Sequence, residues 1–268
     1  MKAIILSAGQ GRRLMPLTEV TPKCCLRPWG DVSILEWQIS QLAVSGIDEV
    51  VVVTGFGDEA VEEVVNGITG IRVRTLFNPF YRLADNLGTC WVARHEMDGP
   101  FVLINGDTLF EAAVLQHLLK DAGHYPITLA TDQKISYDDD DMKIWSERDR
   151  LCRVGKTLDR SHVNGESIGM MVFHQTGAEI FVDKIETLMR KGDGLNRWYL
   201  SAIDELAQTR VVGISSIHGL SWCEVDDPVD FAHAEQVVKT WPIRPPAVKV
   251  EEIVTDAPTQ SLRAYIEK

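Results

Sequence analysis

The chain has 268 residues, 45% of them hydrophobic, with 27 Lys and Arg against 39 Asp and Glu and a formal net charge of −12. No apolar run reaches the 18 residues that a membrane-spanning helix needs, and the short run at the N-terminus lacks the apolar centre of a secretion signal. An acidic chain also binds the nucleic-acid backbone poorly, so we expect a cytoplasmic protein without membrane insertion or a nucleic-acid partner.

The first half of the chain alternates apolar runs with segments of helical periodicity. Strands are predicted over 2–7, 49–54, 71–77, 101–104 and 127–131, and helices over 33–45, 58–65, 83–97 and 111–122. Continuous apolar runs are typical of strands that are buried on both faces of a sheet. The repeated order of strand, helix and strand therefore predicts an α/β fold, with a Rossmann-like, mostly parallel sheet and helices on both faces.

The pattern changes after Asp132, where short strands and loops follow each other. Strands are expected over 142–145, 151–155, 168–174 and 211–217, and helices over 178–190, 197–207 and 228–239. We interpret residues 1–241 as one domain in which residues 133–225 form most of a small acceptor-binding subdomain. The Pro-rich, non-periodic residues 242–268 read as a loosely docked C-terminal extension.

Five cysteines are scattered along the chain without a Cys-x-x-Cys pair or any metal-ligand spacing. This pattern predicts reduced, mostly buried thiols in a reducing compartment, and no structural zinc site.

The segment Leu6–Leu14 (Leu-Ser-Ala-Gly-Gln-Gly-Arg-Arg-Leu) follows the first strand directly. Glycines at such a turn let backbone N–H groups approach a phosphate, and a neighbouring Arg adds a bidentate donor. The segment is neither a Walker loop nor a dinucleotide fingerprint. Residues 1–27 carry five cations and one anion within an acidic chain, so this region offers the local positive charge that a polyphosphate needs.

Together with Pro22-Lys23, this segment resembles the signature of the nucleotidyltransferases that make NDP-sugars and CDP-alcohols. The usual pattern is Ala-Gly-x-Gly-Thr/Ser-Arg-Leu followed by Pro-Lys, and here Arg12 takes the Thr/Ser position. Asn105-Gly106-Asp107 and the segment Val225–Asp230 resemble two further motifs of that family, each of which holds a metal-binding aspartate. The resemblance covers about residues 1–240.

The resemblance implies a role for nine residues. It gives Mg²⁺ to Asp107 and Asp226, and catalysis to Arg13 and Lys23, while the nucleotide is expected to contact Ala8, Gly9, Gly11, Asn86 and Gly106. Asp107 follows a buried strand, where ligands of open α/β sheets bind, and Mg²⁺ is commonly held by one or two carboxylates plus phosphate oxygens. Asp227 is the competing ligand, but the family register favours Asp226 and leaves Asp227 as a helix cap.

The acceptor is harder to predict. The segment Asn78–Leu87 (Asn-Pro-Phe-Tyr-Arg-Leu-Ala-Asp-Asn-Leu) resembles the bacterial choline-phosphate cytidylyltransferases, and a trimethylammonium group is recognised by aromatic faces and carboxylates. The aromatic candidates are Trp145, Trp198, Tyr199 and Trp222. The anionic candidates are Glu166 and the run Asp138–Asp141, which otherwise reads as a solvated loop, and Lys143 and Lys156 are candidates for holding the acceptor phosphate.

The sequence therefore predicts a Mg²⁺-dependent transfer of a cytidylyl group from CTP to phosphocholine or a related phospho-amino-alcohol, with release of pyrophosphate. The closest alternative is a sugar-1-phosphate nucleotidyltransferase that makes an NDP-sugar. A regulatory nucleotide-binding module without catalysis is a further alternative, although the joint presence of Arg13, Lys23, Asp107 and Asp226 argues against it. The base preference and the oligomeric state, including a homo-oligomer, stay open at this point.

Overall fold

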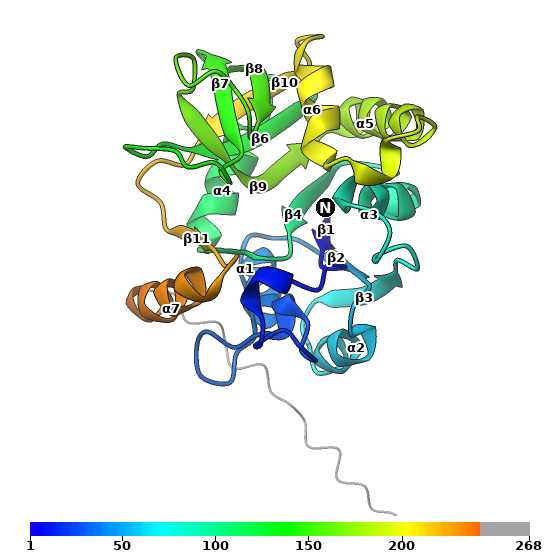
Figure 1. Cartoon of the computed structure of the whole chain (residues 1–268), viewed down its shortest axis with the longest axis vertical. Helices are drawn as coiled ribbons and strands as arrows, with labels where there is room; N and C mark the ends of the chain where they lie inside the picture. Colours follow the sequence, from blue (N-terminus) through cyan, green and yellow to red (C-terminus); the bar gives the residue numbers. More distant parts are fainter. Residues whose placement is uncertain (242–268) are drawn as a thin grey trace, which may run out of the picture.

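A nine-stranded sheet in the order β3-β2-β1-β4-β9-β6-β10-β8-β7 forms the centre of the fold (Figure 1). The computed structural model describes residues 1–241, so the C-terminal extension predicted over 242–268 lies outside the described residues. The strands of this sheet are β1 Lys2–Leu6, β2 Glu49–Thr54, β3 Arg72–Phe77, β4 Phe101–Asn105, β6 Ile127–Asp132, β7 Lys143–Glu147, β8 Arg150–Gly155, β9 Gly165–Phe173 and β10 Val212–Ser216.

Seven of these nine strands run in one direction, and β8 and β9 run in the opposite direction. The predicted mostly parallel α/β sheet is thereby confirmed. Strand β9 is buried along its whole length and lies between β4 and β6, antiparallel to both. The sequence predicted a strand there, but an apolar run carries no signal for its direction.

Helices cover both faces of the sheet, as predicted. Helices α3 (Asn86–Val92), α5 (Gln175–Met189) and α6 (Tyr199–Ala207) pack against one face, and α1 (Ile34–Val44), α2 (Asp58–Asn66) and α4 (Ala112–Asp121) against the other (Figure 1). Alternate residues of the central strands supply the two cores: Ile4 faces the first, whereas Ala3 and Ile5 face the second. Burial on both faces explains why these strands read as continuous apolar runs.

A two-stranded antiparallel sheet of β5 (Thr108–Phe110) and β11 (Trp222–Glu224) lies beside the main sheet. Helix α7 (Pro228–Val237) packs on it in a third apolar cluster that also contains Leu14. Neither strand was predicted, because a strand of three residues is too short to show periodicity. This small sheet brings residues 107 and 226 together, since β5 follows Asp107 directly and β11 ends two residues before Asp226.

One other prediction is corrected by the structure. The helix expected over 83–97 is shorter: α3 starts at Asn86 because residues 80–83 form a turn in which the Leu83 N–H donates to the Phe80 carbonyl at 2.8 Å, and Ala93–Glu96 is a separate 3-10 turn. The segment 133–225 supplies β7–β10 to the same continuous sheet and also holds α5 and α6. Its role as an acceptor-binding subdomain stays a prediction. Within residues 1–241, no helix is long and apolar enough to cross a membrane.

Candidate active site

The loop after β1 is held in one conformation by its neighbours. The Ser7 N–H donates to the Val53 carbonyl at 2.9 Å, and the Ala8 carbonyl accepts from the Phe56 N–H at 3.0 Å. Gly11 has a φ of +69°, a left-handed conformation that favours glycine, and its carbonyl accepts from the Thr18 hydroxyl at 2.7 Å. The predicted phosphate loop is therefore a preformed turn at the carboxyl end of β1.

Gly106 joins this loop to the end of β4. Its N–H donates to the Leu6 carbonyl at 3.0 Å, and a Cβ atom at this position would lie 2.5 Å from Ser7 Oγ and 2.6 Å from the Leu6 carbonyl oxygen. Only glycine allows the two backbones to approach this closely. Gly106 thus sets the position of the neighbouring Asp107 relative to the loop.

Lys23 lies between the two aspartates that the sequence singled out as metal ligands. Its Nζ is 2.7 Å from Asp107 Oδ2 and 2.6 Å from Asp226 Oδ1, and its side chain is 13% exposed. A Cβ atom on Gly11 would lie 3.0 Å from the Lys23 Cβ, so the small residue at position 11 makes room for the lysine. The structure therefore brings three predicted residues, 84 and 203 positions apart in the chain, into one contact.

The electrostatics of this group favour the charged forms of Lys23 and Asp226. Burial alone would lower the pKa of Lys23, but the carboxylates of Asp107 and Asp226 outweigh it and raise that pKa above the ordinary value. Burial alone would raise the pKa of Asp226, but Lys23 and then Arg13 lower it. A cationic pair facing two carboxylates is an arrangement that can exchange its partners for phosphate and a divalent ion.

Arg13 connects this group to the acidic run of the second half of the chain. Its guanidinium is 2.8 Å from Asp226 Oδ2 and 2.8 Å from Asp140 Oδ2, and Asp140 also accepts from Lys156 at 3.0 Å. The run Asp138–Asp141 is largely exposed, in agreement with its interpretation as a solvated loop. Its own hydrogen bonds and these ion pairs hold it beside the site.

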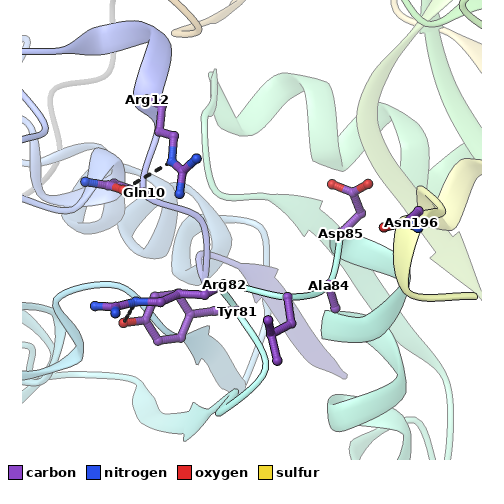
Figure 2. Close-up of a pocket in the computed structure, with 8 residues that line it drawn as sticks. Gln10, Arg12, Tyr81, Arg82, Ala84, Asp85 and Asn196 are labelled. Carbon is purple, nitrogen blue, oxygen red and sulfur yellow. Dashed lines mark hydrogen bonds between the residues drawn. The ribbon is translucent and has the colours of Figure 1, made fainter.

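Three cavities surround the loop after β1. The first, of about 140 Å³, is lined by Leu6, Ser7, Gly9, Gly11, Lys23, Cys24, Gly106 and Asp107. The second, of about 260 Å³, is lined by Leu6, Ala8, Gly9, Tyr81, Ala84, Asp85, Asn86, Thr89 and Trp198. The third, of about 360 Å³, shares Tyr81, Ala84 and Asp85 with the second and adds Gln10, Arg12, Arg82, Leu83 and Asn196 (Figure 2). All five predicted nucleotide contacts, at positions 8, 9, 11, 86 and 106, line the first or the second cavity.

Glu224 is a carboxylate to which the sequence motifs assign no role. Burial, and then the nearby carboxylates of Asp107 and Asp226, raise its pKa well above the ordinary value, against the opposing effect of Lys23. Its side chain makes no hydrogen bond or ion pair with any residue of the described chain. Its position two residues before Asp226, at strand spacing, was the signal that could have identified it.

The four aromatic candidates for an acceptor cage do not form one. No two of these rings contact each other within residues 1–241. Tyr199 is 1% exposed and donates its hydroxyl to Asn105 Oδ1 at 3.0 Å, Trp145 packs on His162, and Trp222 donates to Asp132 at 2.7 Å. Trp198, which is 42% exposed, lines the second cavity with Lys156 at 4.8 Å from its ring centroid.

Lys143 also departs from its predicted role. It is 1% exposed, and its Nζ donates to the carbonyls of Asp141 and Lys156. A lysine that supports two backbone carbonyls in the interior is a structural residue and has no path to an acceptor phosphate. Lys156 remains at the edge of the site through Asp140 and Trp198.

The predicted burial of the thiols is confirmed: four of the five free cysteines are buried, and Cys152 is half-buried. Within residues 1–241, no three His, Cys, Asp or Glu side chains gather as a metal-binding group. The chain therefore offers a divalent ion the two carboxylates of Asp107 and Asp226. The Oδ1 of Asp107 is buried without a hydrogen-bond partner.

The comparison with known proteins agrees with this geometry. The chain is 29% identical over 243 residues to CMP-5'-(3-aminopropyl)phosphonate synthase of Streptomyces rubellomurinus, covering 88% of this chain and 38% of that relative. It is 24% identical over 243 residues to choline-phosphate cytidylyltransferase of Streptococcus pneumoniae, covering 89% of this chain and 99% of the relative. The chain thus spans less than half of one relative and nearly all of the other.

Its fold is similar to that of the inositol-1-phosphate CTP transferase from T. maritima, with a TM-score of 0.75, 19% identity, and coverage of 89% of this chain and 96% of that one. Residues 2–133, which hold the loop after β1, Lys23 and Asp107, match the sequence profile of the family described as Nucleotidyl transferase. This match covers residues that form the site, so the first half of the chain is similar to the nucleotidyl transferase family.

Proposed function

We propose that the protein transfers a cytidylyl group from CTP to a small phosphorylated acceptor that carries an ammonium group, with phosphocholine as the expected example. An oxygen of the acceptor phosphate attacks the α-phosphorus of CTP, and a P–O bond forms there. The bond between the α-phosphorus and the bridging oxygen breaks, and pyrophosphate leaves. Since the acceptor phosphate is already anionic, the reaction needs positioning and charge stabilisation and no general base.

The chain's own residues divide this task between them. Gly9 and Gly11 line the cavity where the triphosphate would lie, and the lack of side chains lets it approach their backbone closely. Lys23 is placed to stabilise charge at the α-phosphate. Arg13 has a planar guanidinium suited to two phosphate oxygens, and it would exchange Asp140 and Asp226 for the leaving pyrophosphate.

The side chains of Asp107 and Asp226 fit a divalent ion such as Mg²⁺. Two carboxylates with phosphate oxygens and water are the ligand set that Mg²⁺ commonly uses, and the unpartnered Oδ1 of Asp107 leaves a buried acceptor available for it. When bound, the ion would supply Lewis acidity and positive charge next to the phosphates.

The observation that supports a cationic acceptor is the half-buried carboxylate of Glu224, whose side chain has no hydrogen-bond or ion-pair partner within residues 1–241. A carboxylate beside two others is costly to ionise, and a further cation close to it lowers that cost. An ammonium group attached to the acceptor phosphate would supply that cation next to the Asp107–Asp226 pair. The two sequence relatives fit this reading, since the acceptor parts in their names, aminopropylphosphonate and choline phosphate, both carry a positively charged nitrogen.

A sugar 1-phosphate is the alternative acceptor, because sugar hydroxyls also donate hydrogen bonds to carboxylates. The two classes differ in charge, so one matrix of acceptors and nucleotides separates them. We expect pyrophosphate release with CTP and phosphocholine, phosphoethanolamine or an aminoalkylphosphonate. Robust release with glucose 1-phosphate or mannose 1-phosphate, and none with any cationic acceptor, would replace this proposal by the sugar-nucleotide reading.

Glu224→Gln sharpens the test, because it keeps the shape of the side chain and removes its charge. We expect the KM for a cationic acceptor to rise at least tenfold while the KM for CTP stays within a factor of two. The matched control is Glu147→Gln, which removes an exposed carboxylate paired only with Arg150. No release of pyrophosphate with any pair of substrates would favour a nucleotide-binding module without catalysis.

A cytoplasmic location belongs to the same proposal, since the five free thiols suit a reducing compartment.

A further inference from the structure

Asp85 occupies the N-cap position of α3 without capping it. An N-cap aspartate commonly accepts a hydrogen bond from the N–H of the second or third helical residue. Asp85 has the extended backbone of an N-cap, but its side chain accepts no such bond. The carboxylate of Asp85 makes no hydrogen bond or ion pair with any other residue between 1 and 241.

The start of α3 does not need this carboxylate because the segment before α6 replaces it. The N–H of Asp85 donates to the Leu195 carbonyl at 2.7 Å, and the N–H of Leu87 donates to the Arg197 carbonyl at 3.2 Å. Asn86 accepts in turn from the backbone of Tyr199 at 2.8 Å. These contacts supply hydrogen-bond partners to backbone N–H groups at the start of α3. The side chain of Asp85 is therefore free for another role.

The free carboxylate projects into the cleft beside the loop after β1. Asp85 lines both the second and the third cavity, and Figure 2 shows its carboxylate across the third cavity from Arg12 and Arg82. Arg12 contacts Gln10 and Arg82 contacts Tyr81, and neither guanidinium is ion-paired with a carboxylate in the described chain. The cleft is thus polarised, with a hydrogen-bond acceptor at one end and cations at the other.

A nucleotide bound at the loop would bring its base into this cleft. The first cavity, with Lys23 and Asp107, is the place for the α-phosphate, and it shares Gly9 and Leu6 with the second cavity. The walls of the second cavity include Tyr81 and Trp198, whose rings can stack on a flat base. A base in that cavity lies within the reach of the only carboxylate among its lining residues, Asp85.

We infer that Asp85 reads the nucleobase by accepting a hydrogen bond from the exocyclic amine of cytosine. The inference rests on the proposed function and adds the residue that sets its base preference. Cytosine presents an N–H₂ donor where uracil presents a carbonyl oxygen, and carboxylates accept from this amine in other base-recognition sites. With UTP, the carboxylate of Asp85 would face the uracil carbonyl, and two acceptors would repel each other.

The test is calorimetric binding of CTP and UTP to the full chain with Mg²⁺, without acceptor, for the wild type and Asp85→Asn. We expect the wild type to bind CTP at least tenfold more tightly than UTP. Asp85→Asn should lower this ratio about tenfold, because an amide can turn either its oxygen or its nitrogen toward the base. Asp183→Asn, on an exposed position of α5, is the matched control and should keep the wild-type ratio.

Each outcome is decisive. A ratio that stays unchanged in a folded Asp85→Asn variant, judged by its thermal midpoint, overturns the inference, and so does a wild type that binds CTP and UTP equally. If Asp85→Asn instead raises the KM for the acceptor at an unchanged base ratio, the carboxylate serves the acceptor and the inference is wrong. Loss of the ratio in a protein that transfers nothing would keep the inference and refute the proposed function.

Discussion

Replacing Lys23 by methionine tests the centre of the site, because methionine keeps the apolar length of the side chain and removes the charge. The lysine makes two short contacts, at 2.7 Å to Asp107 and 2.6 Å to Asp226. Hydrogen bonds to charged groups contribute about 1.5–3 kcal/mol each, and removing one partner of a buried ion pair costs about 3–5 kcal/mol. The side chains of Asp107 and Asp226 are 23% and 27% exposed. We therefore expect Lys23→Met to lower the unfolding free energy by the smaller of these values, about 3 kcal/mol.

The assay is urea unfolding of the metal-free protein for Lys23→Met, Asp107→Asn and the double variant. This double-mutant cycle isolates the interaction energy between the side chains of Lys23 and Asp107. We expect a coupling free energy of about 1.5–3 kcal/mol. Lys184→Met is the control, because Lys184 also pairs with a carboxylate, Glu205, at 3.2 Å. Its side chains are 25% and 37% exposed, against 13% and 23% for Lys23 and Asp107. We therefore expect a smaller coupling for the control pair, about 1 kcal/mol or less. A coupling near zero for Lys23 and Asp107 would refute the ionic arrangement described above.

The same variant separates two roles for Lys23 in the reaction. If the ammonium stabilises charge in the transition state, Lys23→Met should lower kcat by about 10²–10³ and leave the KM for CTP nearly unchanged. A change confined to KM would show that Lys23 contributes to ground-state binding alone. Lys184→Met should keep the wild-type kcat.

Three further predictions concern single positions. Asp226→Ala should abolish turnover, whereas Asp227→Ala should keep it. Because Asp227 caps α7 by accepting from the N–H groups of Val229 and Asp230, its loss should lower the unfolding free energy by about 1 kcal/mol. An active Asp226→Ala and an inactive Asp227→Ala would show that Asp227, not Asp226, is the metal ligand. Gly106→Ala should weaken CTP binding at least tenfold in calorimetry, because its Cβ would collide with Ser7 and Leu6, and wild-type affinity would contradict the proposed close packing. Burial raises the pKa of Glu166 to about 7, against the opposing effect of Lys134. A carboxyl with a raised pKa stabilises the fold below its unfolded pKa near 4.5 and loses that contribution as the pH rises to 7. Glu166→Gln should therefore flatten the pH dependence of the unfolding free energy between these two pH values. An unchanged pH profile would contradict the raised pKa.

The sheet and its helices were largely predictable because their cause is local. Strands such as Glu49–Thr54 are buried on both faces and read as unbroken apolar runs, and Ser33 with Glu36 forms the capping box that starts α1. The direction of β9 and the pairing of β5 with β11 depend on contacts between segments that lie far apart in the chain. No periodicity within either segment encodes those contacts.

The same distinction applies to the site. Lys23, Asp107 and Asp226 were identified from motifs that keep fixed spacing to a strand end or a helix start. The carboxylates of Asp85 and Glu224 were not identified as site residues. They stand out because they lack hydrogen-bond and ion-pair partners within residues 1–241, and the sequence alone does not show which side chains lack partners. Tyr199 was misread for the opposite reason: its ring looks available in the sequence, yet its hydroxyl is tied to Asn105 in the interior.

Phosphorus NMR of one reaction mixture tests the central claim most directly, since it follows the bond that forms and the bond that breaks. With CTP, phosphocholine and Mg²⁺, we predict that the protein produces equal amounts of inorganic pyrophosphate and a new diphosphate with two coupled phosphorus resonances. Asp226→Ala should leave the spectrum of the substrates unchanged. Release of inorganic phosphate without a new diphosphate, or a spectrum that stays constant with every cationic acceptor, would contradict cytidylyl transfer to a phosphorylated amino-alcohol.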